Sequence, residues 1–325
     1  MAVLALALGA ITAPFGSVLA AQKEQGGDKI VISGASGELA GEVIRALLLR
    51  GVKLADLVLV TRTPEKLSSF STNGAAVRLG DFDKPETLEP AFAGGRELLL
   101  VSTNSTGDRV AQHTNAIQAA RKVGIRHIVY TSFINATNDN PALMARTHQL
   151  TEEVLMRSGV RFTILRNQLY MDGLLNEAVE AVKTGDLYTN GGKGKWAPVA
   201  RQDCAEVAAA VLTTPGHEGK IYDLTGPELI NHQDLAKIIA DVTGKRVRAI
   251  EVDDATFMGR ELRAGVPEAQ VKLDASLGVA LRANALNIRS DVLRILLGRE
   301  PRSVRDLMMD NKSRLLSATA QLRAN

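Results

Sequence analysis

The sequence has a single cysteine and no pattern of metal-binding residues. Cys204 is the only cysteine among 325 residues, so an internal disulfide and a cysteine-rich zinc site are both excluded. The five histidines show no metal-ligand spacing, and neither an HExxH motif nor a GxSxG nucleophile elbow occurs. The residues for metal chemistry and for a serine hydrolase of that type are therefore missing, which leaves metal-free chemistry driven by a cofactor.

A block of charge of one sign is also missing. The 39 basic and 36 acidic residues are spread along the chain and leave a formal charge of +3. No basic run is interleaved with aromatic residues, so the sequence gives no case for a nucleic-acid partner. Hydrophobic residues make up 45% and charged residues 23%, as in an ordinary globular protein, and the length suits one large domain or two intimate ones.

Charged side chains are absent altogether from residues 1–22. This stretch is rich in Ala, Val and Leu and ends in small residues of the kind that a signal peptidase requires. We therefore expect residues 1–28 to be an apolar leader and spacer, with a cleaved signal peptide favoured over an extra apolar helix on the domain. The lack of Lys or Arg argues against a signal peptide unless the true start lies elsewhere, and Pro14 and Gly16 argue against a membrane-spanning helix. Cleavage of residues 1–20 as a signal peptide implies an exported or periplasmic protein; otherwise a cytoplasmic one is expected.

From Lys29 onward, short apolar runs alternate with amphipathic stretches, which is typical of parallel βαβ units. Six strands with crossover helices are expected up to residue 165, the number found in a Rossmann fold. We therefore predict a doubly wound parallel α/β sheet over residues 29–167. A smaller, mainly helical C-terminal substrate lobe, interleaved with the core and containing a strand at 220–224, is expected over residues 168–325. The six expected strands are 29–33, 57–61, 75–79, 98–102, 126–130 and 161–165.

A glycine-containing loop follows the first expected strand, with the sequence Gly34-Ala35-Ser36-Gly37-Glu38-Leu39-Ala40. Glycine at position 34 allows a tight turn, and glycine at position 37 lets backbone amides approach a pyrophosphate at the helix N-terminus. Ala40 stands where this fingerprint takes Gly or Ala. An ordinary strand-to-helix turn is the alternative, but the position between a clear strand and a clear helix favours a dinucleotide site.

The end of the second expected strand indicates which dinucleotide is bound. NAD-binding proteins place Asp or Glu there, whereas this chain has Thr61-Arg62, and an arginine can hold a 2′-phosphate through charge-assisted hydrogen bonds. NADP(H) is therefore the expected cofactor and NAD(H) the alternative; for Arg62 itself, a solvated surface residue is the other interpretation. After the third strand, Asp81 could accept a hydrogen bond from adenine with Phe82 beside the ring, while Asp83 could simply cap a helix.

These motifs, in this order, resemble the NmrA-like branch of the atypical short-chain dehydrogenases. The similarity is greatest to the type 2 NAD(P)H:quinone oxidoreductases and the triphenylmethane-dye reductases, and it covers roughly residues 29–310. The apolar leader departs from it. Besides the glycine loop, Thr61-Arg62 and Gly80-Asp81-Phe82-Asp83, the matching segments are Tyr130-Thr131-Ser132-Phe133, His148-Gln149-Leu150-Thr151-Glu152 and Leu165-Arg166-Asn167-Gln168-Leu169-Tyr170.

The resemblance implies an NADPH-dependent reductase that passes a hydride directly to a quinone or a similar planar small molecule. None of the four tyrosines has a lysine four residues later, so carbonyl–alcohol chemistry by a Tyr-x-x-x-Lys pair is disfavoured. The protein would instead supply orientation and a dry apolar pocket. The implied cofactor contacts, beyond the motifs above, come from Ser102, Thr103, Thr131, Ser132, Phe133 and Asn167. The implied substrate contacts come from Phe133, Asn135, Tyr170 and Met171.

His148 is the candidate catalytic residue. It stands one turn before Glu152, where many NmrA-like relatives keep a lysine. It could touch the nicotinamide ribose or give a proton to a reduced quinone, since histidine changes charge near neutral pH; it could equally be a hydrogen-bonded helix residue with no such role. For Tyr170 and Met171, a core aromatic and a gap-filling methionine are the corresponding structural interpretations.

Two other functions stay open at this point. The chain could be a non-catalytic NADP(H) sensor that binds a partner protein, as other NmrA-like proteins do, or a reductase of another activated double bond. The segment from Asn167 to Met171 looks suited to a ligand, which favours an enzyme over a sensor. The sequence also leaves a homodimer open.

Overall fold

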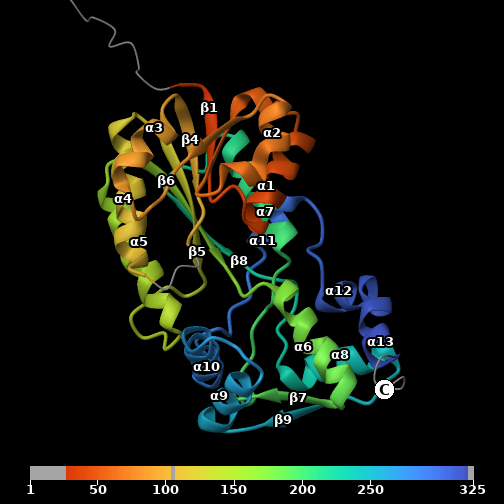
Figure 1. The fold of residues 1–325 in the computed structure, drawn as a ribbon. Coiled ribbons are helices and arrows are strands. Elements are labelled where there is room, and N and C mark those ends of the chain that lie inside the picture. Colours follow the sequence, from red (N-terminus) through yellow and green to blue (C-terminus); the bar gives the residue numbers. More distant parts are fainter. Residues whose placement is uncertain (1–26, 104–106, 321–325) are drawn as a thin grey trace, which may run out of the picture.

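Seven parallel strands form the central sheet of the computed structural model, which describes residues 27–103 and 107–320 (Figure 1). In chain order they are β1 (Lys29–Ser33), β2 (Leu57–Thr61), β3 (Ala76–Leu79), β4 (Gly95–Leu100), β5 (His127–Phe133), β6 (Arg161–Asn167) and β8 (Lys220–Leu224). Their order in the sheet is β3-β2-β1-β4-β5-β6-β8. The sheet therefore reverses its direction of growth between β1 and β4, and ligands of doubly wound sheets bind at the carboxyl ends of the strands beside such a switch point.

The predicted doubly wound α/β sheet is confirmed. Every residue of β2 and β5 is buried, which explains why the sequence shows continuous apolar runs rather than alternation. β4 begins at Gly95, three residues earlier than expected, because it pairs with β1 across a register shift next to Lys29. The expected strand at 220–224 pairs with β6 and thus extends the main sheet.

Helices cover both faces of this sheet (Figure 1). One face carries α3 (Leu88–Phe92), α4 (Arg109–Lys122) and α5 (Leu143–Arg157); the other carries α1 (Glu38–Leu49), α2 (Ser68–Thr72), α7 (Arg201–Thr213) and α11 (Val292–Leu297). The two faces have separate apolar cores: Val31 of β1 packs toward the α4 side and its neighbour Ile32 toward the α1 side. Alternate residues of one strand thus anchor opposite layers.

The remaining helices form a lobe beyond the carboxyl edge of the sheet, at the bottom of Figure 1. Its apolar core includes Phe133 from the end of β5 and Met171 from the loop after β6, so the sheet edge and the lobe are packed together. A two-stranded parallel ribbon of β7 and β9 closes the far side. The lobe elements are α6 (Leu174–Thr184), β7 (Asp186–Thr189), α8 (His232–Thr243), β9 (Arg248–Glu251), α9 (Asp254–Arg263), α10 (Glu268–Arg282), α12 (Val304–Asp310) and α13 (Lys312–Ala320).

The predicted apolar leader falls on residues 1–28, of which all but the last two lie outside the described residues. It therefore stays a prediction. Within residues 27–103 and 107–320, no helix has the length and apolar character needed to span a bilayer. In the same part of the chain, no three His, Cys, Asp or Glu side chains gather in a way that could hold a metal ion.

Candidate functional site

The glycine loop lies at the switch point, between β1 and α1. Gly34 has a φ of +60°, a left-handed conformation that glycine adopts without strain. The N-cap residue of α1 is Gly37, and no side chain caps the helix. A side chain at position 37 would crowd the loop, because its Cβ would lie 3.1 Å from the Gly34 carbonyl oxygen. The first turn of α1 therefore presents free backbone N–H groups and the positive end of the helix dipole, which together suit a phosphate.

Arg62 lies directly after β2, beside this loop. Its side chain is exposed, and none of the described residues forms a hydrogen bond or an ion pair with the guanidinium. The neighbouring hydroxyls are organised: Ser36 Oγ lies 2.9 Å from Thr61 Oγ1, which also accepts a hydrogen bond from the Thr63 amide. The structure thus brings Arg62 and Ser36 together at one end of the loop, with the arginine free for an anionic ligand.

Asp81 and Phe82 follow β3, and both are partly buried. Asp81 accepts a hydrogen bond from the Asp83 amide, which leaves its second carboxylate oxygen without a partner among the described residues. Asp83 does not cap a helix; both of its oxygens accept from Gln112 Nε2, at 2.8 and 2.9 Å. α4 therefore holds the 81–83 loop in place.

Three predicted cofactor residues meet where β4 and β5 end. The Ser102 amide donates to Thr131 Oγ1 at 2.9 Å, and Thr103 Oγ1 donates to Gln112 at 2.8 Å. The Thr103 amide also donates to His113 Nε2. Gln112 and His113 were not predicted as site residues, and they are 3% and 1% exposed.

The Ser132 side chain is buried and hydrogen-bonds to the carboxylate of the Glu152–Arg166 ion pair. Its hydroxyl donates to Glu152 at 2.6 Å, and Arg166 holds both oxygens of the same carboxylate, at 2.9 and 2.6 Å. Glu152 is 1% exposed. The hydrogen bond and the charge of Glu152 raise the pKa of Arg166. This pair ties α5 to β6, and its residues appeared in the sequence only as parts of family motifs.

His148 lies on α5 with both ring nitrogens engaged. Nδ1 lies 2.8 Å from Tyr130 Oη, and Nε2 lies 3.1 Å from Nη2 of Arg109. The side chain is buried, and its ring stacks on Phe133 with the centroids 6.1 Å apart. Burial, followed by the charge of Arg109, holds the pKa of His148 well below its usual value. Because a guanidinium only donates, Nε2 of the neutral ring is an acceptor, and the proton resides on Nδ1.

The end of β6 and the loop after it carry the predicted residues Asn167, Tyr170 and Met171. Asn167 Nδ2 donates to Tyr170 Oη at 2.7 Å, while Asn167 Oδ1 is buried without a hydrogen-bond partner. Such an orphaned acceptor is costly and suits a ligand that donates a hydrogen bond. Met171 is fully buried in the lobe core, so it does not reach the open edge of the sheet.

An ion pair links this loop to the glycine loop. Arg201, at the start of α7, lies over the Tyr170 ring with Cζ 5.5 Å from its centre. The same guanidinium pairs with Glu38 at 2.9 Å and lies 3.6 Å from Asp172. Segments far apart in sequence thus meet around the first turn of α1. No role in the site was predicted for Arg201, because its only local signal in the sequence is its position before an apolar helix.

Asn135 connects the end of β5 to the lobe. Its φ is +48°, one of two positive values among the described non-glycine residues, and asparagine tolerates this conformation better than most. The side chain donates to the Ala285 carbonyl at 2.9 Å. Gln168 similarly donates to the Leu286 carbonyl at 3.1 Å. The segment after α10 is therefore fixed against two of the loops expected to form the substrate pocket.

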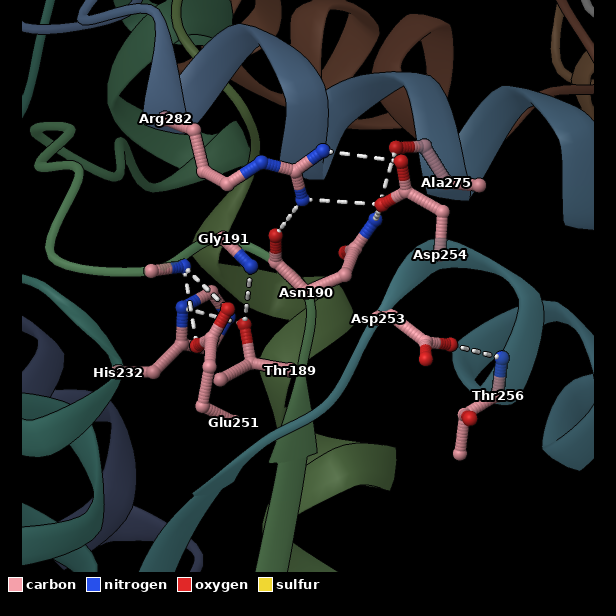
Figure 2. Close-up of polar contacts among 11 residues, drawn as sticks. Thr189, Asn190, Gly191, His232, Glu251, Asp253, Asp254, Thr256, Ala275 and Arg282 are labelled. Carbon is pink, nitrogen blue, oxygen red and sulfur yellow. Dashed lines mark hydrogen bonds and ion pairs between the residues drawn. The ribbon is translucent and has the colours of Figure 1, made fainter.

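Figure 2 shows how α9 and α10 are held on the β7–β9 ribbon. The Asn190 amide donates to Asp254 at 2.8 Å and to the Ala275 carbonyl at 3.0 Å, and Arg282 pairs with both oxygens of Asp254 at 2.9 Å. These bonds lower the pKa of Asp254, with Arg282 the largest cause. These hydrogen bonds and ion pairs therefore hold α9 and α10 against the β7–β9 ribbon.

Replacing Gly278 with alanine is expected to destabilise the lobe. A Cβ there would lie 1.9 Å from Asn190 Oδ1, so the amide and its hydrogen bonds must shift. Overpacking of this kind costs roughly 1–3 kcal/mol. Gly41→Ala, in α1, is the matched control because no atom lies within 4 Å of its Cβ, and it should gain up to about 1 kcal/mol of helix stability. Urea unfolding curves that move in the same direction for both variants would contradict this account.

Comparison with known proteins gives consistent matches over most of the chain. The sequence model of a family described as NAD(P)H-binding matches residues 34–215. Quinone oxidoreductase 2 of Escherichia coli K12 is 34% identical over 269 residues, which are 83% of this chain and 93% of that protein.

Two solved structures share the fold at similar identity. One is the NADPH-dependent quinone oxidoreductase QOR2 from Escherichia coli complexed with NADPH, with a TM-score of 0.83 and 32% identity over 88% of this chain and 99% of that one. The other is the triphenylmethane reductase of Citrobacter sp. complexed with NADP(H), with a TM-score of 0.82 and 32% identity over 87% and 99% of the two chains. The resemblance noted in the sequence is confirmed.

Proposed function

This chain belongs to the NAD(P)H-binding, NmrA-like family, and from that membership we propose that it is an NADPH-dependent reductase that passes a hydride directly to a quinone or a similar planar small molecule. The observation that carries the proposal is the uncapped start of α1 beside an unpaired Arg62, at the switch point of the sheet. The names of the relatives support the choice of acceptor, since they include a quinone oxidoreductase, an azoreductase and a triphenylmethane reductase.

The residues at the site fit a dinucleotide phosphate. The free N–H groups after Gly37 suit the pyrophosphate, and the guanidinium of Arg62 suits a 2′-phosphate. The orphaned Oδ1 of Asn167 offers an acceptor at the other end of the sheet edge. Bound NADPH supplies the hydride.

The protein's own residues act by position and charge. His148 is neutral, with its proton directed at Tyr130, so it holds no proton for a substrate in this arrangement. His113 is similarly kept neutral, because burial and the charge of Arg109 lower its pKa to about 3. We therefore expect the proton that completes hydroquinone formation to come from water, while the buried ring of Phe133 and the packed lobe keep the hydride path dry.

The experiment is NADPH oxidation by p-benzoquinone, followed at the nicotinamide absorbance band with purified protein. We expect catalytic turnover with NADPH and slower turnover with NADH. Tight NADPH binding combined with no turnover of several quinones would overturn the proposal and favour a sensor that binds a partner protein. N-terminal sequencing from the native host would separately decide whether residues 1–20 are removed.

A further inference from the structure

Arg109 is a partly buried cation without a carboxylate partner. It is the first residue of α4, the helix that comes after β4 in the chain. Among the described residues no Asp or Glu forms an ion pair with it; the hydrogen bond it makes goes to His148, and its Nε is buried without a partner. A guanidinium held in this way costs desolvation energy that nothing within the described structure offsets.

The groups around Arg109 are neutral. Burial lowers the pKa of His113 and of His148, so near pH 7 both rings are neutral, and burial raises the pKa of Tyr130, so it is not a phenolate. The nearby carboxylate of Glu152 is already held by Arg166 and Ser132. Within the described part of the chain no group compensates the charge of Arg109, which leaves it available to an anionic group of a bound molecule.

The position of Arg109 indicates which part of a bound molecule it meets. Its partner His148 lies on α5 and contacts Tyr130 of β5, and β4 separates β5 from the glycine loop at β1. His113, which ties α4 to Thr103, contacts the Tyr130 ring, and Phe133 stacks on His148. Arg109 is thus placed among the residues expected at the reacting end of the site, away from Arg62 after β2.

We propose that Arg109 binds the oxygen anion that forms on the acceptor when it is reduced. This inference rests on the proposed reductase function. A quinone that takes up one hydride from NADPH gains two electrons and one proton and becomes a hydroquinone monoanion, leaving NADP+. One proton from water then gives the hydroquinone. Arg109 donates an N–H to the phenolate oxygen while its charge develops, and His148 holds the guanidinium in that orientation.

The first test uses 4-nitrophenol, a phenol whose ionised form has its own colour, bound to the protein loaded with NADP+. Arg109 should favour the phenolate, so the pKa of bound 4-nitrophenol should fall below its value in water. Arg109→Gln should abolish that shift, Arg109→Lys should keep part of it, and Arg121→Gln, at an exposed position in the last turn of α4, should leave it intact. A shift that survives in Arg109→Gln would overturn the inference, whether or not the protein turns over quinones.

The second test compares an acceptor that becomes an anion on reduction with one that becomes neutral. A neutral quinone becomes an anion on hydride uptake, whereas a triarylmethyl dye cation becomes neutral and gains nothing from Arg109. We expect Arg109→Gln to slow quinone turnover about 100-fold, as when a single oxyanion donor is removed, and to spare the dye. Equal losses with both acceptors, together with weaker NADPH binding, would mean that Arg109 serves the cofactor's phosphates and would overturn the inference. A wild-type protein inactive with every acceptor would instead defeat the proposed function and leave the 4-nitrophenol result to decide on Arg109 as an anion site.

Discussion

Changing Arg62 to aspartate is expected to weaken NADPH binding about 100-fold while changing NADH binding far less. Arg62 is exposed and unpaired among the described residues, so its guanidinium is available to make charge-assisted hydrogen bonds with a 2′-phosphate. Hydrogen bonds to a charged group contribute roughly 1.5–3 kcal/mol, and each 1.4 kcal/mol is tenfold in affinity. Aspartate adds repulsion toward the phosphate and offers an acceptor to the 2′-hydroxyl of NADH.

The measurement is nucleotide affinity, by the fluorescence of the reduced cofactors. Arg45→Asp is the control, because Arg45 is also exposed, on α1, and within the described part of the chain its ion pair is with Glu42. It makes the same change of net charge at a site with no expected phosphate contact. Equal losses of NADPH and NADH affinity in Arg62→Asp would refute the assigned role of Arg62.

Changing Glu152 to alanine is expected to cost about 3–5 kcal/mol of unfolding free energy. Removal of one partner from a buried ion pair leaves the other charge uncompensated, and costs of this size are typical. Here the partly buried Arg166 of β6 loses a two-point contact, and the buried Ser132 of β5 loses its acceptor.

Glu153→Ala is the matched control on the same helix. Glu153 pairs with Arg157 at 3.4 Å near the surface, and exposed pairs of this kind contribute at most about 0.5 kcal/mol. Urea unfolding can be followed by circular dichroism and by the fluorescence of Trp196, the only tryptophan. Similar midpoints for the two variants would show that the Glu152 pair does not stabilise the fold.

The sheet could be predicted from the sequence because its strands are buried on both faces. Runs such as 29–33 and 57–61 are apolar and β-branched, and they match β1 and β2 residue for residue. The pairing of strands that are far apart in the sequence could not be predicted in this way, because it depends on contacts that no local pattern encodes. The strand at 220–224 was expected, but its place beside β6 was not.

The site was predictable to the extent that local backbone chemistry defines it. The glycine loop and Arg62 depend on a strand, a turn and a helix in immediate succession, which sequence alone reveals. Arg109 and Arg201 instead act through neighbours on other elements. One local signal existed: Arg109, Gln112 and His113 form a polar stripe on one face of an expected helix, a pattern that suggests buried polar contacts.

The most direct test of the central claim is a single-turnover experiment without oxygen. Protein loaded with NADPH is mixed rapidly with p-benzoquinone, and the loss of the nicotinamide absorbance is compared with that for NADPH carrying deuterium at the transferred position. Direct hydride transfer predicts oxidation of one bound equivalent in a single step, slowed by deuterium. Bound NADPH that stays reduced with quinones and dyes alike would contradict the account.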